Sequence, residues 1–355
     1  MKHVQKQLMI DTLLEEVKKD EPGVVLMGEY DNGEYFCSHR GLADLKLGTA
    51  VDENTLFDIA SLSKQFTACC IYILDSRKKL SLEDSIRKYL PELPNYAEAI
   101  TIRHLLNHTS GIIDYIDLVL KQGIDFIDNL DNNGTLQILS ATESPSFPPG
   151  SQFCYSNSNY VLLAIITERI SGKTLNDFAT ETIFRPLGMT KTFYNQSYPI
   201  RQASAQGYDL NITNGNYSPV QCIWTQTGDG AVFSSCRDLI KWGKNLSSHS
   251  KLNSAVVENL LCPMPEALLG SPVKDYVRYS AGLSIQEDFG QKSALHSGSW
   301  IGFSSFFVRH LESELTIVAL SNREDFNTGL LAYKASEILL NKFIGQYEVQ
   351  TDMGY

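Results

Sequence analysis

The sequence predicts an α/β protein whose sheet is built from both ends of the chain, with a mainly helical segment inserted between them. Short apolar runs suited to strands occur near the N-terminus and again after Gly188, where Gly, Asn and Ser separate them. Between these two regions the apolar residues recur mostly at helical spacing. Because the strand-like runs flank the helical segment, we expect a discontinuous α/β part formed by the two ends of the chain.

The composition is that of a folded globular protein. The chain has 355 residues, 43% hydrophobic and 20% charged, which is enough for one large domain or two smaller ones. A formal net charge of −11 without a dense Lys/Arg run argues against nucleic-acid binding. No apolar run approaches the roughly 20 residues that cross a bilayer.

Cysteine usage and the N-terminus bear on the cellular compartment. The seven cysteines lack C-x-x-C spacing and suit a reducing environment, and Cys154 is expected to be a small core residue. The first residues lack the apolar segment of a secretory signal, which predicts a cytoplasmic location if the natural chain begins at Met1.

The first elements are a helix and a hairpin. Apolar residues near a helical period predict an amphipathic helix over residues 4–18, which Pro22-Gly23 ends. Residues 24–27 and 35–37 flank Asp31-Asn32-Gly33, a pattern that predicts a β-hairpin with a glycine in its turn.

The middle of the chain predicts helices, and the last third predicts strands. Helices are expected from residue 61 to about 74, from 81, at 101–106 and from 161 to 172, with a proline-rich loop at 144–150. The strands of one sheet are expected at 230–233, 279–285, 303–308 and 315–320, followed by a C-terminal helix at 330–343.

Ser61 and Lys64 begin the first helix of the inserted segment. Residues three apart share a helix face, so the Ser61 hydroxyl and the Lys64 amine can form a hydrogen bond. The first turn also favours developing negative charge. A lysine activates a serine only if burial or a nearby charge lowers its pKa. Apolar neighbours flank this pair, whereas the other Ser-x-x-Lys pairs lie in polar surroundings: Ser76/Lys79, Ser85/Lys88, Ser248/Lys251 and Ser271/Lys274.

Two further segments are candidate parts of a site, each with an ordinary structural alternative. Tyr155-Ser156-Asn157 precedes a buried helix, where Tyr155 would share the proton of Ser61 and Asn157 would donate to a substrate carbonyl; the alternative is a turn with a packed tyrosine. Residues 296–299, His-Ser-Gly-Ser, fall between two predicted strands. Gly298 would let a substrate backbone approach closely; the alternative is a glycine-rich connection with one exposed histidine.

His104 and His108 have the i, i+4 spacing of a metal-binding pair. The glutamate of H-E-x-x-H is absent and no third ligand group stands out, so helix-end capping is the favoured interpretation.

The order of several motifs carries more information than any one of them. The series resembles that of the serine β-lactamase and penicillin-binding-protein superfamily, especially class C β-lactamases, D-alanyl-D-alanine carboxypeptidases and related esterases. The resemblance covers residues 24–322 and rests on Ser61-Leu62-Ser63-Lys64, His108-Thr109-Ser110-Gly111, Tyr155-Ser156-Asn157, Pro186-Leu187-Gly188-Met189, Gly228-Asp229-Gly230 and His296-Ser297-Gly298.

This resemblance implies a β-lactamase/transpeptidase-like fold. It has an α/β part, an antiparallel sheet flanked by helices, beside an inserted all-α subdomain, with the active site between them. We therefore expect one catalytic domain over residues 1–345, followed by a tail at 346–355. Within the domain, residues 1–60 and about 195–345 would form the α/β part, and about 61–194 the helical part.

The resemblance also implies roles for individual residues. Ser61 would be the acylated nucleophile, Lys64 its proton acceptor, and Tyr155 the group that assists as base and protonates the leaving group. The backbone N–H groups of Ser61 and Ser299 would form the oxyanion hole. Asn157 would orient the substrate amide or Lys64, with His296 and Gly298 also contacting the substrate. The reaction would be acyl transfer to water, with no metal and no organic cofactor.

His296 departs from the pattern of penicillin-recognising members, which carry the lysine of Lys-Thr-Gly there. A histidine with an unperturbed pKa of about 6.5 is mostly neutral near neutral pH, so it binds a substrate carboxylate less well. We therefore expect an esterase-like or D-amino-acid peptidase-like serine hydrolase acting on a small ester or amide. The alternatives are a true β-lactamase or DD-carboxypeptidase and, from another class, a catalytically silent binding or scaffold protein.

The expected partner is a small-molecule ester, amide or β-lactam. Neither nucleic acid nor a membrane is an expected partner, and the sequence alone gives no oligomeric state. The presence of Ser61, Lys64 and Tyr155 together argues against a silent scaffold, which has no chemical need for all three.

Overall fold

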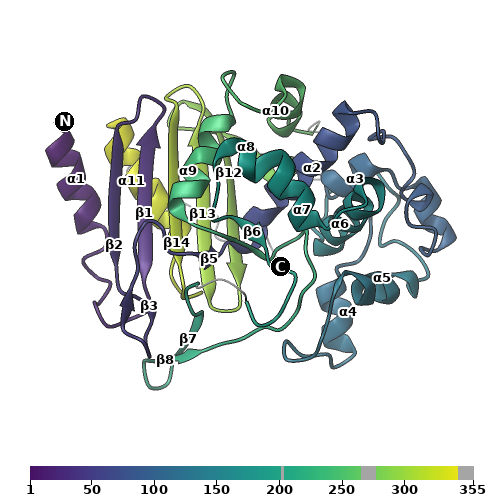
Figure 1. The fold of residues 1–355 in the computed structure, drawn as a ribbon, viewed down its shortest axis with the longest axis horizontal. Helices are drawn as coiled ribbons and strands as arrows, with labels where there is room; N and C mark the ends of the chain where they lie inside the picture. Colours follow the sequence, from purple (N-terminus) through teal and green to yellow (C-terminus); the bar gives the residue numbers. More distant parts are fainter. Residues whose placement is uncertain (201–203, 265–276, 343–355) are drawn as a thin grey trace.

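The computed structural model describes residues 1–200, 204–264 and 277–342, and its central element is an antiparallel sheet (Figure 1). The strand order is β10-β11-β12-β13-β14-β1-β2. Val24 on the first strand lies opposite Ser321 on the last, so the two ends of the chain meet in this sheet. The strands are β1 (Val24–Tyr30), β2 (Tyr35–Arg40), β10 (Val277–Ser280), β11 (Leu283–Asp288), β12 (Gln291–Trp300), β13 (Phe303–His310) and β14 (Leu315–Ser321).

Helices cover both faces of the sheet. Figure 1 shows α9 (Cys236–Asn245) in front of it, and α11 (Thr328–Leu340) behind it. The alternation of side chains along β1 explains this arrangement, because successive residues point to opposite faces. Val24 and Leu26 pack in one apolar cluster with residues of α11 and of α1 (His3–Thr12), whereas Val25 and Met27 pack in a second cluster that contains residues of α9.

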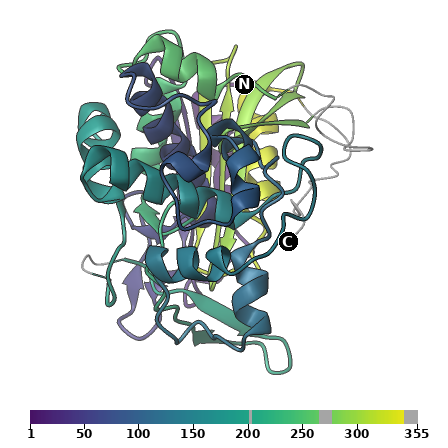
Figure 2. The ribbon, with the colours of Figure 1, turned by 90° about the vertical axis from the view of Figure 1, so that its right-hand side faces the viewer.

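A group of helices lies at one side of the sheet, and Figure 2 views the molecule from that side. Two of its helices, α2 and α6, are buried over most of their length. Gly172 ends α6 in the left-handed conformation, with φ of 69°. The group consists of α2 (Lys64–Ser76), α3 (Ile102–Leu106), α4 (Tyr115–Lys121), α5 (Asn132–Ser140), α6 (Asn157–Ser171), α7 (Leu175–Ala179), α8 (Arg185–Leu187) and, packed beside α2, α10 (Ser254–Leu260).

Three small sheets complete the fold of the residues that the structure describes. The pairs β3 (Leu42–Asp44) with β4 (Thr49–Ala50), and β7 (Tyr208–Asn211) with β8 (Asn216–Pro219), are two-stranded. The third contains β5 (Phe57–Asp58), β9 (Val232–Ser234) and β6 (Phe193–Tyr194), with β9 in the middle. This last sheet fixes the chain segment that leads directly into Ser61.

The predicted hairpin and C-terminal helix are confirmed, whereas the predicted first helix is too long. The helix α1 ends at Thr12, and turns carry the chain through residues 13–17. Val4 and Leu8, expected on the buried face, are 68% and 60% exposed. The turns instead bring Leu14 into the core, so tertiary packing overrides the helical period.

Three other boundaries differ from the sequence-based prediction. The helix expected from residue 81 is reduced to a 3₁₀ helix, Ile86–Lys88. Residues 279–285 form two strands, because Ala281 and Gly282 turn the chain with φ of 40° and 87°. Residues 232–234 belong to the small sheet with β5, so the prediction that they join the main sheet is wrong.

The expected tail at 346–355 and the pair Ser271/Lys274 lie outside the described residues. Within the described residues, we find no helix with the length and apolarity required to span a membrane.

Candidate active site

Ser61 lies on a 3₁₀ helix, Ala60–Ser63, which joins β5 to α2. The turn begins with Ala60 at φ of 49°, a conformation that is costly for a residue with a side chain. The Asp58 carboxylate stabilises this turn by accepting a hydrogen bond from the Ala60 N–H at 2.8 Å. The Ser63 hydroxyl also stabilises the turn, because it donates to the Ala60 carbonyl at 2.6 Å and accepts the Val232 N–H at 3.1 Å. Ser61 therefore lies one turn before α2, whereas the sequence predicted that it would lie in the first turn of that helix.

Lys64 is fully buried and its amine contacts Ser61. The Lys64 Nζ donates to the Ser61 Oγ at 3.0 Å, the Asn157 Oδ1 at 2.8 Å and the backbone carbonyl of Asp229 at 2.8 Å. Burial lowers the pKa of Lys64 to about 8, although the nearby carboxylates of Asp229 and Asp114 oppose the shift. A substantial fraction of the amine is therefore neutral just above neutral pH and is able to accept the hydroxyl proton.

The other Ser-x-x-Lys pairs that the structure describes follow the ordinary interpretation. Lys79 and Lys251 are exposed, and Lys88 forms an ion pair with Asp84. Burial of the whole side chain thus distinguishes Lys64 from its described counterparts.

Asn157 is the first residue of α6, and Asp114 fixes its orientation. The Asn157 Nδ2 donates to the Asp114 Oδ2 at 2.9 Å, and the Asn157 backbone N–H donates to the same oxygen at 2.7 Å. Because Asp114 occupies the amide N–H, the Asn157 carbonyl oxygen points at Lys64. Of the two roles considered for Asn157, this geometry favours orienting Lys64. Sequence reasoning missed Asp114, whose only local signal is its place as the N-cap of α4.

Tyr155 lies beside Lys64, with 4.9 Å between the Lys64 Nζ and the centre of the Tyr155 ring. The His108 ring stacks on it at 4.3 Å, and the His108 Nδ1 accepts the Ser156 N–H at 3.1 Å. Since Nδ1 accepts, the neutral ring carries its proton on Nε2, which donates to the Tyr279 hydroxyl at 3.1 Å. Burial, with Lys64 nearby, holds the pKa of His108 well below its usual value. His108 is therefore a neutral positioning residue for the Tyr155 segment, a role that sequence reasoning missed.

The structure also tests the predictions for His104 and Cys154. His104 accepts the Thr101 N–H at 3.1 Å through its Nδ1, which confirms helix capping for that histidine. The described residues contain no group of three or more side chains suited to hold a metal ion. Cys154 is exposed, so its prediction as a core residue is wrong.

His296 lies within β12 and is buried, so the alternative of an exposed histidine in a loop is wrong. Its Nδ1 donates to the Ser297 carbonyl at 2.5 Å, and its Nε2 has no hydrogen-bond partner in the described part of the chain. Burial, with Lys64 nearby, lowers the pKa of His296 to about 3. His296 is therefore neutral throughout the physiological pH range.

Gly298 lets β12 lie against the nucleophile segment. A Cβ at this position would lie 2.4 Å from the Ser305 Oγ and 2.5 Å from the Ile59 carbonyl oxygen. Protein atoms thus fill the space that the sequence analysis reserved for a substrate. Ser299, one residue on, lines the pocket beside Ser61 and donates from its Oγ to Glu324 at 2.7 Å.

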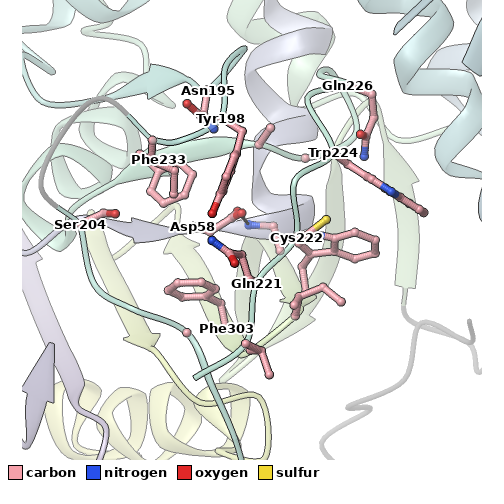
Figure 3. A pocket seen from close by; sticks show the side chains of 18 of the residues that line it. Asp58, Asn195, Tyr198, Ser204, Gln221, Cys222, Trp224, Gln226, Phe233 and Phe303 are labelled. Atoms are coloured by element: carbon pink, nitrogen blue, oxygen red, sulfur yellow. Dashed lines mark hydrogen bonds between the residues drawn. The ribbon is translucent and has the colours of Figure 1, made fainter. Parts of the chain in front are cut away.

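Ser61 is one of the residues that line a pocket with a volume of about 270 Å³. Figure 3 shows this pocket with several of its other lining side chains labelled. Its described lining includes three aspartates, Asp44, Asp58 and Asp229, but neither Lys nor Arg. Burial raises the pKa of Asp58 to about 7, and the Asp229 carboxylate adds to the shift. The remaining wall includes apolar and aromatic groups such as Trp224, Phe233, Trp300, Ile301 and Phe303.

Asp229 contributes to the site through two different groups. Its backbone carbonyl accepts from Lys64, while its Oδ2 accepts the Tyr115 hydroxyl at 3.0 Å. The Tyr115 oxygen in turn accepts from the Gln226 Nε2 at 2.8 Å. In the sequence, Asp229 stands out only as part of a motif, whereas Tyr115 and Gln226 carry no signal because they come from separate segments.

Comparisons with known proteins agree with this architecture. The family model described as Beta-lactamase matches residues 9–339. Penicillin-binding protein 4* of Bacillus subtilis (strain 168) is 32% identical over 356 residues, covering 91% of this chain and 72% of the relative. A penicillin-binding protein structure from Bacillus halodurans is 25% identical with a TM-score of 0.79, covering 94% of this chain and 99% of that one.

A structure of D-amino acid amidase from Ochrobactrum anthropi SV3 complexed with D-phenylalanine shares the fold. Its TM-score is 0.78 at 23% identity, and the match covers 96% of this chain and 100% of that one. The family match and the 32% identical relative cover most of the chain and agree with the predicted superfamily. The chain therefore belongs to the β-lactamase family and is a serine hydrolase with a β-lactamase/transpeptidase-like fold.

Proposed function

We propose that the protein hydrolyses a small ester or amide through an acyl-enzyme on Ser61. The observation that carries the proposal is the buried Lys64 amine, which lies 3.0 Å from the Ser61 Oγ and has its pKa lowered to about 8. A serine needs such a neighbouring base to become a nucleophile.

The reaction takes two steps. Neutral Lys64 accepts the Ser61 proton as the Oγ attacks the substrate carbonyl carbon, and the backbone N–H groups of Ser61 and Ser299 bind the resulting oxyanion. Tyr155 passes the proton to the leaving alcohol or amine as the carbonyl bond to it breaks, leaving the acyl group on Ser61. Water then attacks the acyl-enzyme, giving its proton to the same base, and the acid leaves as the Ser61 hydroxyl is restored.

The charge of the site favours an esterase-like or D-amino-acid peptidase-like activity over antibiotic hydrolysis. His296 is neutral because its pKa is lowered to about 3, so it offers no positive charge to a substrate carboxylate. The described pocket lining adds aspartates and no cationic side chain. The D-amino acid amidase shows that the same fold accommodates an amide-cleaving enzyme.

The second candidate is a true β-lactamase or DD-carboxypeptidase. The observation that favours it is the 32% identity to Penicillin-binding protein 4*, a relative named for binding penicillin. The alternative from another class, a catalytically silent scaffold, is disfavoured because it has no need of the hydrogen bond between Lys64 and Ser61.

Intact-protein mass spectrometry separates these candidates. The protein is incubated with a fluorophosphonate, a penicillin or a p-nitrophenyl ester, and each mass is compared with that of Ser61→Ala. Ser76→Ala, from the exposed pair Ser76/Lys79, is the matched control and should label like wild type.

Fluorophosphonate and acyl adducts that depend on Ser61, without a penicillin adduct, are the expected result. A Ser61-dependent penicillin adduct would favour the second candidate. Labelling that survives Ser61→Ala would contradict Ser61 as the nucleophile, and an absence of any Ser61-dependent adduct would favour the silent scaffold.

A further inference from the structure

We propose that Asp58 is a positioning residue for the reaction at Ser61, because its carboxylate stabilises the turn at Ala60 that directs the Ser61 backbone N–H into the oxyanion hole. The inference rests on the proposed acyl-enzyme mechanism, in which the backbone N–H groups of Ser61 and Ser299 bind the oxyanion. It gives a function to a buried carboxylate that neither attacks the substrate nor takes up the proton of the nucleophile.

The backbone conformation of Ala60 is the feature that Asp58 supports. Ala60 has φ of 49°, in the left-handed region that a residue with a side chain rarely adopts. Such a conformation persists only where the surrounding structure enforces it. The Ala60 N–H donates to the Asp58 Oδ1 at 2.8 Å, and this contact from residue i to i+2 closes a tight turn. The hydrogen bond is therefore formed when the backbone turns at Ala60, and it favours that conformation.

The position of Asp58 is fixed by a sheet and not by the turn. Asp58 belongs to β5 and lies opposite Phe233 of β9. The next residue, Ile59, donates its N–H to the Val232 carbonyl at 2.9 Å. Asp58 is only 9% exposed, and an ionised carboxylate accepts a hydrogen bond roughly twice as strong as the one that a neutral oxygen accepts. The sheet thus anchors the acceptor, and the acceptor in turn stabilises the conformation of Ala60.

The conformation of Ala60 sets the direction of the first oxyanion donor. The planar peptide group between Ala60 and Ser61 carries the Ser61 N–H, so a rotation of the Ala60 backbone rotates this N–H with it. The Ser61 side chain follows in the 3₁₀ helix Ala60–Ser63. A return of Ala60 to a negative φ would therefore turn the Ser61 N–H away from its present direction.

The same turn packs against β12, which carries the second donor. A Cβ at Gly298 would lie 2.5 Å from the Ile59 carbonyl oxygen and 3.1 Å from the Ala60 Cβ. The Ser305 Oγ donates to the Ile59 carbonyl at 2.8 Å, and Ser305 lies opposite Gly298 in the main sheet. Ser299 follows Gly298 in β12, so a displacement of the turn changes the spacing of the two N–H donors.

The test is a double-mutant cycle between Asp58 and Ala60. The kcat/KM for a p-nitrophenyl ester is measured for the wild type, Asp58→Ala, Ala60→Gly and the double variant. The measurements are made at about pH 9, where Lys64 is mostly neutral in its role as base. Circular dichroism of each variant reports whether it is folded.

Asp58→Ala should cost much less when residue 60 is a glycine. In the wild-type background it should lower kcat/KM by about 30-fold, because a misdirected oxyanion donor stabilises the transition state less well. In the Ala60→Gly background the same change should cost about fivefold or less, because glycine adopts a positive φ without help from the carboxylate. A purely structural role for Asp58 would not produce this rescue.

Two further variants serve as controls. Asp52→Ala is the matched control, because the Asp52 Oδ1 accepts the Asn54 N–H at 2.8 Å in the same i to i+2 contact, but in an exposed turn. It should keep kcat/KM within about threefold of the wild-type value. Asp58→Asn keeps an acceptor oxygen for the Ala60 N–H and should retain about one-fifth of the wild-type activity or more.

The outcomes separate this inference from the proposed function. Wild-type activity in Asp58→Ala would overturn the inference and leave the acyl-enzyme on Ser61 intact. An equal loss in the Ala60 and Ala60→Gly backgrounds would also overturn it, because Asp58 would then not act through the turn. If Asp58→Ala does not fold, a folded but inactive Asp58→Asn overturns the inference, and an active one supports it. The absence of a Ser61-dependent acyl adduct in the wild type would instead overturn the proposed function.

Discussion

Two buried cations in this molecule have opposite surroundings. Arg309, on β13, forms an ion pair with both carboxylate oxygens of Asp31, at 2.8 and 2.6 Å. Lys64 donates instead to a hydroxyl, an amide oxygen and a backbone carbonyl, while the nearest carboxylates influence it without contacting it. A direct carboxylate partner keeps a buried cation charged, whereas neutral acceptors allow it to lose its proton. The first arrangement suits structure and the second suits catalysis.

The largest expected effect comes from removing the Lys64 amine. Lys64→Met should lower kcat/KM for a p-nitrophenyl ester by about 1,000-fold, because Ser61 loses its base. Stability should stay the same or rise, since a buried amine without an ion pair is costly. Steady-state kinetics and the thermal midpoint, measured on the same preparation, test both parts. A large fall in the midpoint with activity retained would assign Lys64 to structure.

Asp31→Asn tests the other half of the comparison. It leaves the buried guanidinium of Arg309 without its anion and should cost about 2 kcal/mol of stability, less than for a fully buried pair because Asp31 is partly exposed. Activity at a temperature well below the midpoint should change by no more than about threefold. Urea unfolding provides the measurement. A selective loss of activity at unchanged stability would contradict the structural role.

Asp114→Asn tests how the Asp114 carboxylate influences the protonation of Lys64. The Asp114 carboxylate raises the pKa of Lys64, so its removal should lower that pKa. Since the active form is deprotonated Lys64, activity should then begin to rise at a lower pH. The maximal rate should fall by about tenfold, because Asn157 loses the group that orients it. The pH profile of kcat/KM provides the measurement. A shift of the profile to higher pH would contradict the conclusion that the Asp114 carboxylate raises the pKa of Lys64.

The smallest effect concerns two buried histidines. His296 and His310 have their pKa values lowered by burial to about 3. Each is neutral in the folded state but takes up a proton near pH 6.5 when unfolded, so the unfolded state binds more protons between about pH 6.5 and 3. Stability is therefore full above this window and is lost as the pH falls through it.

Each of these histidines should contribute about 1–2 kcal/mol to the loss of stability between about pH 7 and pH 5. The slope of unfolding free energy against pH, measured by urea unfolding, should be smaller in His310→Gln. His310 is the better residue to change because its two ring nitrogens form hydrogen bonds with Ser293 and Ser336, which are not residues of the candidate active site. An unchanged slope would show that His310 does not contribute to the pH dependence of the unfolding free energy.

The parts of the site that could be predicted from sequence are those with a local signal. Ser61 and Lys64 are three residues apart, so helical spacing alone indicates their contact. Asp114, His108 and Gln226 reach the site from separate segments, and only tertiary packing brings them together. Their identities carry no period or motif that points to the Lys64 amine.

The fold shows the same division between local and tertiary signals. The hairpin of β1 and β2 has a glycine turn and was predictable, whereas β12 was not. The sequence of β12, Gln-Lys-Ser-Ala-Leu-His-Ser-Gly-Ser-Trp, has little apolar alternation, yet pairing with β11 and β13 makes it a strand. This explains why His296 was expected in a loop. The division into parts at about residues 60 and 195 stays a prediction.

The most direct test of the account is the protonation of Lys64 itself. Titration of carbon-13-labelled lysine side chains by NMR, with Lys64 assigned by its absence in Lys64→Met, reports the amine directly. The account predicts one resonance that titrates near pH 8, well below the other lysines. A Lys64 resonance that titrates with the exposed lysines, near about pH 10.4, would contradict the claim that the buried amine serves as the base.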